Sequence, residues 1–116
     1  MRKIYHLSSC STCQKIIKDL KLKEKNFVFQ DIKTEKITSP QLDEMIKMAG
    51  SIEPLFSTKA IKYRELGLKD KKLTTAEKKN FILDEYTFLK RPVIIIDSEI
   101  FIGNSPETIS QVRSIV

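Results

Sequence analysis

One short segment, residues 6–13, constrains this chain more than any other, because it holds both cysteines and the only histidine. A run of β-forming residues leads into it, and apolar residues at helical spacing follow it. A helix that begins at Cys10 places Cys10 and Cys13 on one face with Cα atoms about 5 Å apart, a separation that a disulfide tolerates. The positive end of the helix dipole would favour the Cys10 thiolate. We therefore expect Cys10 to be the nucleophile and Cys13 the resolving cysteine.

The same residues allow simpler interpretations. Free cysteines are often buried and inert, and Ser11 and Thr12 could act only as hydrogen-bonding residues at the start of a helix. His6 could simply hydrogen-bond to the backbone, or its protonated form could stabilise a neighbouring thiolate. Two cysteines would form a zinc site only if His6 and a carboxylate completed the ligand set. We expect no metal.

Length and composition predict one globular domain over residues 1–116, because 41% of the residues are hydrophobic. No apolar run approaches 18 residues, and residues 1–5 lack the apolar core of a signal peptide, so we expect a cytoplasmic protein without a membrane contact. Its cysteines would then be reduced. The net charge of +6 comes from basic residues interspersed with acidic ones. This pattern favours a solvated face over a nucleic-acid surface, and we expect a monomer.

The order of the predicted elements outlines an α/β, thioredoxin-like fold. A βαβ unit comes first and a ββα unit last, which predicts a four-stranded mixed sheet. Helical segments between the two halves form an insertion over about residues 38–90. The outer elements are strands over 3–7, 26–32, 91–97 and 99–103, a helix over 10–22, and a helix that begins after Ser105 with Ile109, Val112 and Ile115 on its inner side.

The insertion contains several helix signals. Ser39 is a predicted N-cap with Pro40 in the first turn, and Gly50 is the predicted end of that helix. Thr74 or Thr75 begins a later helix, with Glu77 placed for a capping box.

Three features of the chain together resemble the family of glutaredoxin-dependent arsenate reductases and Spx-type regulators. They are Cys10-Ser-Thr-Cys13 after the first strand, Arg91-Pro92 before a later strand, and the segment 56–68. The resemblance extends over nearly the whole chain. It implies that Arg91 faces the active cysteine, that Pro92 is cis, and that the loop with Lys59 lies opposite the site. Arg91 would be catalytic, and Pro92 and Lys59 would bind substrate together with Ser11 and Thr12.

The resemblance implies a cytosolic thiol-disulfide oxidoreductase with no bound cofactor, restored by glutathione, glutaredoxin or thioredoxin. Cys13 also fits an alternative, an Spx-like redox sensor that binds RNA polymerase, since the arsenate reductases usually have serine at that position. A third alternative is an inactive thioredoxin-like binding module. The arsenate reductases use three arginines to hold the oxyanion, whereas this chain has Ser57 and Asn104 where two of them are expected. We therefore expect poor arsenate turnover.

Overall fold

The computed structural model describes residues 1–116, which form two compact units. Unit 1 consists of Met1–Glu35 and Arg91–Val116, and unit 2 consists of Lys36–Lys90. Unit 2 has nearly the same bounds as the predicted insertion, and the assignment of the whole chain to one domain stays a prediction. None of the helices combines the length and the apolar character that crossing a membrane requires.

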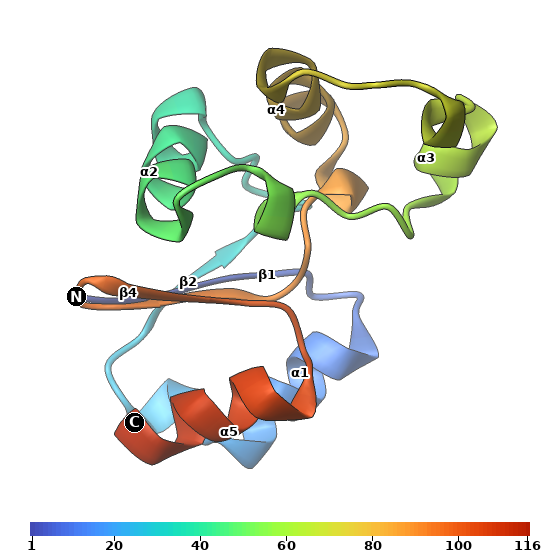
Figure 1. The fold of residues 1–116 in the computed structure, drawn as a ribbon. Helices are drawn as coiled ribbons and strands as arrows, with labels where there is room; N and C mark the ends of the chain where they lie inside the picture. The colour runs from blue at the N-terminus through green and yellow to red at the C-terminus, as the bar shows by residue number, and fades with distance from the viewer. The chain divides into compact units, whose positions relative to one another are not determined.

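Unit 1 contains a four-stranded mixed sheet with the strand order β2-β1-β3-β4 (Figure 1). The central strand β1 (Arg2–His6) is parallel to β2 (Val28–Asp31) and antiparallel to β3 (Val93–Ile96). The hairpin partner of β3 is β4 (Glu99–Ile102). The α/β fold and the mixed sheet predicted from the order of elements are therefore confirmed.

Two helices, α1 (Ser11–Asp19) and α5 (Pro106–Ile115), cover one face of this sheet (Figure 1). Ile4 and Ile94 are paired on neighbouring strands and belong to the apolar cluster on this face. Because side chains alternate along a strand, His6 extends from the same face as Ile4. The cluster also contains Ile16, Ile17 and Leu20 from the α1 segment and Val112 from α5.

The helix ends in unit 1 differ in part from the sequence prediction. The first helix was predicted over 10–22, but α1 ends at Asp19 because Lys21 adopts a left-handed conformation with φ 53°. A short 3-10 turn, η1 (Leu22–Glu24), follows. Ser105 is the N-cap of α5, as predicted, and its Oγ accepts a 3.2 Å hydrogen bond from the backbone N–H of Thr108.

Unit 2 is helical and contains no strand longer than an isolated bridge. Its elements are α2 (Ser39–Ala49), η2 (Glu53–Leu55), α3 (Ile61–Glu65), η3 (Leu68–Asp70), α4 (Thr75–Asp84) and η4 (Tyr86–Phe88). The N-cap of α2 is Thr38 rather than the predicted Ser39, because Thr38 and Gln41 form a reciprocal capping box. Gly50 ends α2 with φ 88°, as expected. Thr74 caps α4 through the predicted box with Glu77.

Aromatic packing and backbone hydrogen bonds join the middle of unit 2, around Phe56, to its last residues. Phe56 stacks on Phe88 with ring centroids 5.4 Å apart, and Phe81 packs against Phe88 at 5.3 Å. An antiparallel bridge joins Phe56 to Leu89. Beside it, the N–H of Lys90 donates a 2.8 Å hydrogen bond to the carbonyl of Leu55.

Candidate active site

The loop between β1 and α1 places Cys10 at the amino end of the helix. The N–H of Cys10 donates to the carbonyl of Leu7 at 2.9 Å, which closes a turn, and the N–H of Gln14 donates to the carbonyl of Cys10 at 3.1 Å, which opens the helix. Cys10 is the N-cap residue, with extended backbone angles of −90° and 112°. The sequence correctly predicted a helix that starts at this cysteine.

Cys10 is half-buried, and its surroundings favour the thiolate. Burial by itself would raise the pKa of Cys10, but this effect is more than offset. The backbone N–H and the thiol of Cys13 and the N–H of Thr12 donate hydrogen bonds to the Cys10 sulfur, and the charge of Arg91 adds to their effect. The net result is a pKa below the ordinary value for a thiol.

Cys13 has the opposite character. Its side chain is 0% exposed, and burial is the main cause that raises its pKa to about 11. The nearby Cys10 charge and the hydrogen bond that Cys13 donates to Cys10 raise it further, while a backbone hydrogen bond from Leu7 and the charge of Arg91 oppose the shift. The pair therefore consists of one accessible, readily ionised thiol and one buried, protonated thiol. Both thiols are free.

Arg91 and Pro92 come to this site from the other half of unit 1. The peptide bond between them is cis, as the family resemblance implies. The Arg91 charge lowers the pKa of both cysteines, so its guanidinium lies within electrostatic reach of the two sulfur atoms. The carbonyl of Pro92 accepts a 2.9 Å hydrogen bond from the N–H of Gly103, which ties the start of β3 to the end of β4.

The remaining predicted substrate-binding residues lie in different places. Thr12 contacts the Cys10 sulfur through its backbone N–H, and Ser11 is the exposed first residue of α1. Lys59 belongs to unit 2, where it is exposed and its N–H donates to the Ser57 hydroxyl at 3.4 Å. The roles of Ser11, Thr12 and Lys59 in substrate binding stay predictions.

His6, the last residue of β1, packs edge-to-face against Phe29 with centroids 5.8 Å apart. Its Nδ1 atom is buried and has no hydrogen-bond partner. Burial lowers the pKa of His6, Asp31 opposes this shift, and the charge of Lys23 adds to it. The neutral imidazole is therefore favoured at neutral pH, whereas the predicted stabilisation of the thiolate needs the protonated form. That role of His6 stays a prediction.

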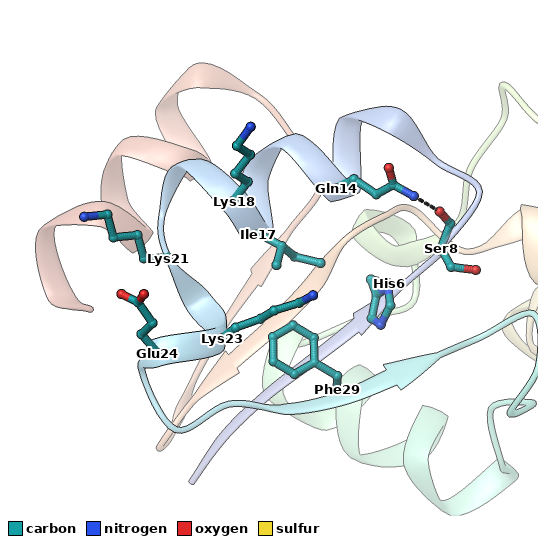
Figure 2. Close-up of a pocket in the computed structure, with 9 residues that line it drawn as sticks. All are labelled: His6, Ser8, Gln14, Ile17, Lys18, Lys21, Lys23, Glu24 and Phe29. Atoms are coloured by element: carbon teal, nitrogen blue, oxygen red, sulfur yellow. Dashed lines mark hydrogen bonds between the residues drawn. The ribbon is translucent and has the colours of Figure 1, made fainter.

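A cavity of about 540 Å³ lies beside α1 in unit 1 (Figure 2). Ser8 and Gln14 line it, and the side-chain amide of Gln14 donates a hydrogen bond to the carbonyl of Ser8. The sequence analysis did not identify this cavity. The signal for it is the spacing of Gln14, Lys18 and Lys21 at intervals of four and three residues, which places them along one side of a helix.

The remaining lining of the cavity is cationic and apolar. Lys18, Lys21 and Lys23 contribute three ammonium groups against the single carboxylate of Glu24. His6, Ile17 and Phe29 complete the wall, and Figure 2 shows the Lys23 side chain running alongside the Phe29 ring with its ammonium group pointing toward His6. Nowhere in the chain do three or more His, Cys, Asp or Glu side chains gather in a group able to hold a metal ion.

Comparisons with known proteins identify a family and several solved structures that this chain resembles. The model of the ArsC family matches residues 5–112 of the chain. The solution structure of a protein from Staphylococcus aureus is 30% identical in sequence, with a TM-score of 0.77, and the match covers 96% of this chain and 97% of that one. No curated protein matches the chain.

Two more distant structures share the fold. The arsenate reductase from Vibrio cholerae has a TM-score of 0.81 at 18% identity, with 96% of each chain covered. A solution structure of an arsenate reductase-related protein from Brucella melitensis has a TM-score of 0.73 at 23% identity, covering 98% of this chain and 92% of that one.

Proposed function

We propose that this chain, which belongs to the ArsC family and is related to arsenate reductases, is a cytoplasmic thiol-dependent reductase that works through Cys10 and Cys13. The observation that carries the proposal is the contrast between the two thiols. Cys10 is accessible and its pKa is lowered, whereas Cys13 is buried and its pKa is raised to about 11. This contrast suits a nucleophile beside a resolving cysteine, because the thiolate is the form that attacks.

The reaction proceeds in two displacement steps. The Cys10 thiolate attacks one sulfur of a disulfide substrate, which forms a mixed disulfide and releases one thiolate. Cys13 then attacks the Cys10 sulfur, which forms the Cys10–Cys13 disulfide, and the proton of Cys13 passes to the second substrate thiolate as it leaves. Two electrons pass from the dithiol to the substrate. Glutathione, glutaredoxin or thioredoxin returns two electrons and two protons to restore the dithiol.

The two pKa shifts give the steps their order. The Cys10 charge and the hydrogen bond to Cys10 help to keep Cys13 protonated in the resting enzyme. Both effects disappear when Cys10 becomes part of a mixed disulfide, so the pKa of Cys13 falls at the moment when its thiolate is needed. The buried thiol therefore stays protected until a substrate is attached.

Arsenate is a poor fit for the same site. A dianion is held well only by several charge-assisted donors, of which bidentate arginine is the most effective. In unit 1, Arg91 is the arginine whose charge acts on the thiols. Asn104, which stands where a further arginine is expected, is neutral and exposed. We therefore propose a disulfide as the substrate and expect slow arsenate reduction.

Trapping of the intermediate tests the proposal. The Cys13→Ser variant should accumulate a mixed disulfide at Cys10, detected as an added mass on the peptide that carries Cys10, whereas the Cys10→Ser variant should not react. The wild type should turn over the same disulfide with a thiol reductant and reduce arsenate much more slowly. Efficient arsenate reduction by the wild type would contradict the proposed disulfide substrate and would indicate an oxyanion instead.

The cysteine pair also supports a second candidate function, a redox-sensing regulator similar to Spx. In that case oxidation to the Cys10–Cys13 disulfide would change binding to RNA polymerase and there would be no turnover. Polymerase subunits that co-purify with one redox form, together with no reductase activity, would favour this regulator over the enzyme.

A further inference from the structure

We propose that a cavity within unit 2 binds a small anion that carries neighbouring phosphate groups, such as a diphosphate or a triphosphate. The cavity has a volume of about 350 Å³, and we call it the lysine cavity because Lys71, Lys72, Lys78 and Lys90 line it. All of its lining residues belong to unit 2. None of the residues assigned to the redox site is among them, so this inference goes beyond the proposed reductase function.

Folding gathers the four lysines from three separate segments. Lys71 and Lys72 follow the turn η3, Lys78 belongs to α4, and Lys90 lies beyond η4. The backbone N–H groups of Lys71 and Lys90 donate hydrogen bonds of 3.0 and 2.8 Å to carbonyl groups of unit 2, which fixes where these two side chains begin. Along the sequence these lysines alternate with acidic residues and predict only a solvated face. The fold instead places them around one hollow.

One of the four lysines is already neutralised. Lys78 Nζ lies 2.6 and 2.7 Å from the two carboxylate oxygens of Glu53 and 5.6 Å from the centre of the Phe56 ring. The Lys78 side chain is only 16% exposed. Glu53 is the single acidic residue that lines the cavity. This pair therefore leaves the charges of the other three lysines uncompensated.

Those three lysines, Lys71, Lys72 and Lys90, take part in no ion pair. Glu77 lies near one of them, because hydrogen bonds from Thr74 and, to a smaller extent, the charge of Lys71 lower the pKa of Glu77. Its carboxylate, however, accepts a 2.9 Å hydrogen bond from the Thr74 N–H, and Glu77 does not line the cavity. Three like charges around one hollow repel one another, and a bound anion would relieve that repulsion.

The chemistry of lysine favours phosphate as the anionic group. The ammonium group is a compact point charge with three donors, and lysine is a common phosphate ligand. A phosphate group carries up to about two negative charges and three acceptor oxygens, whereas a carboxylate carries one charge. A diphosphate or triphosphate can therefore meet three ammonium groups within a small volume. The volume of the cavity falls in the usual range of small-molecule sites, about 300–1,000 Å³.

The lining also offers a surface to an aromatic ring. Tyr63 is half-buried and packs edge-to-face against Phe56 with ring centroids 6.1 Å apart, and both residues line the cavity. Nucleobases stack readily on such side chains. A nucleotide and an inorganic polyphosphate are thus two sources of the same phosphate chemistry.

The experiment titrates the reduced protein with sodium triphosphate in the absence of divalent cations. Two-dimensional amide NMR locates the site, and calorimetry gives the dissociation constant. Saturable shifts should appear at Lys71, Lys72 and Lys90, and binding should weaken as salt is added, because salt screens exposed charges. The cavity beside α1 is also lined by lysines and is the internal comparison. Equal shifts at Lys18 and Lys23 would indicate unspecific binding to basic surface and would overturn the inference.

Two double variants test the role of the lysines. Lys71→Met/Lys90→Met should weaken triphosphate binding about tenfold, from the usual value of two exposed charge pairs. The matched control, Lys47→Met/Lys62→Met, removes the same charge from exposed positions of unit 2 that do not line the cavity, and it should leave binding nearly unchanged. Equal losses in the two double variants would overturn the inference.

Glu53→Gln tests the same site with the opposite sign. The change removes the single negative charge of the lining and releases the Lys78 ammonium, so triphosphate should bind several-fold more tightly. A gain in binding does not arise from misfolding, so this result is independent of any loss of stability. The control is Glu44→Gln, at an exposed position of α2 outside the cavity. An equal gain in both variants would reduce the effect to net charge and contradict the site.

The remaining outcomes concern the ligand. No saturable binding of triphosphate at millimolar concentration would overturn the inference. A short poly-aspartate peptide that binds as tightly as triphosphate would show a site for acidic peptides and would overturn the assignment to phosphate. ATP that binds more tightly than triphosphate, with the gain lost in Tyr63→Leu, would support the site and identify a nucleotide as the source. Equal affinities would support it with the phosphate groups alone.

Discussion

Iodoacetamide added to the reduced protein at pH 7 should modify Cys10 at least about ten times faster than Cys13, since the thiolate is the reactive form. The two cysteines belong to one turn of chain and would be equivalent in an unfolded peptide. The difference therefore reports what the fold does to each thiol.

The magnitude follows from the two pKa shifts. A pKa of about 11 leaves about one Cys13 in 10,000 ionised at pH 7. A thiol with the ordinary pKa of 9.0 is about 1% ionised at pH 7. The pKa of Cys10 is below 9.0, so a larger fraction of Cys10 is ionised. The more basic Cys13 thiolate is the better nucleophile by about eightfold over two pKa units. Together, the difference in ionised fraction and the difference in nucleophilicity leave Cys10 reacting about ten times faster than Cys13. This ratio is a lower bound, because Cys13 is also 0% exposed.

The assay is a time course of alkylation, quenched and analysed by peptide mass spectrometry. The same protein in concentrated denaturant is the control, and there the two cysteines should react at similar rates. Equal rates in the folded protein, or faster labelling of Cys13, would refute the assignment of Cys10 as the nucleophile.

Three further predictions concern the site and the fold. Arg91→Met should move the pH midpoint of Cys10 alkylation upward by up to about one unit, because an opposite charge no longer favours the thiolate; an unchanged midpoint would remove Arg91 from the site. Thr74→Ala removes the N-cap of α4 and should lower the free energy of unfolding in urea by about 1 kcal/mol, and no change would show that α4 does not depend on its cap. Ile94→Ala empties a fully buried position in β3 and should cost about 2–5 kcal/mol. The control Ile115→Ala, at a position 41% exposed, should change stability by no more than about 0.5 kcal/mol, and equal losses would contradict the assignment of the core.

Features that depend on neighbouring residues could be predicted from the sequence. The start of α1 at Cys10, the cap of α5 at Ser105 and the end of α2 at Gly50 all rest on hydrogen bonds or backbone angles within a few residues. The shift of the α2 cap from Ser39 to Thr38 is a one-residue choice between two hydroxyl side chains, which Gln41 decides by completing the capping box. Ile115 was predicted to face inward, but it is the last residue of α5 and is 41% exposed.

Features that depend on distant segments were decided by the tertiary structure. The sequence placed two cysteines on one face of a helix, but their unequal pKa values arise from burial and from the charge of Arg91, which packing brings from the far end of the chain. The cavity beside α1 likewise exists only because β1, β2 and η1 meet around that helix. Local hydrogen bonds are encoded within a few residues, whereas solvent exclusion and the electric field at a sulfur atom depend on every segment that packs around it.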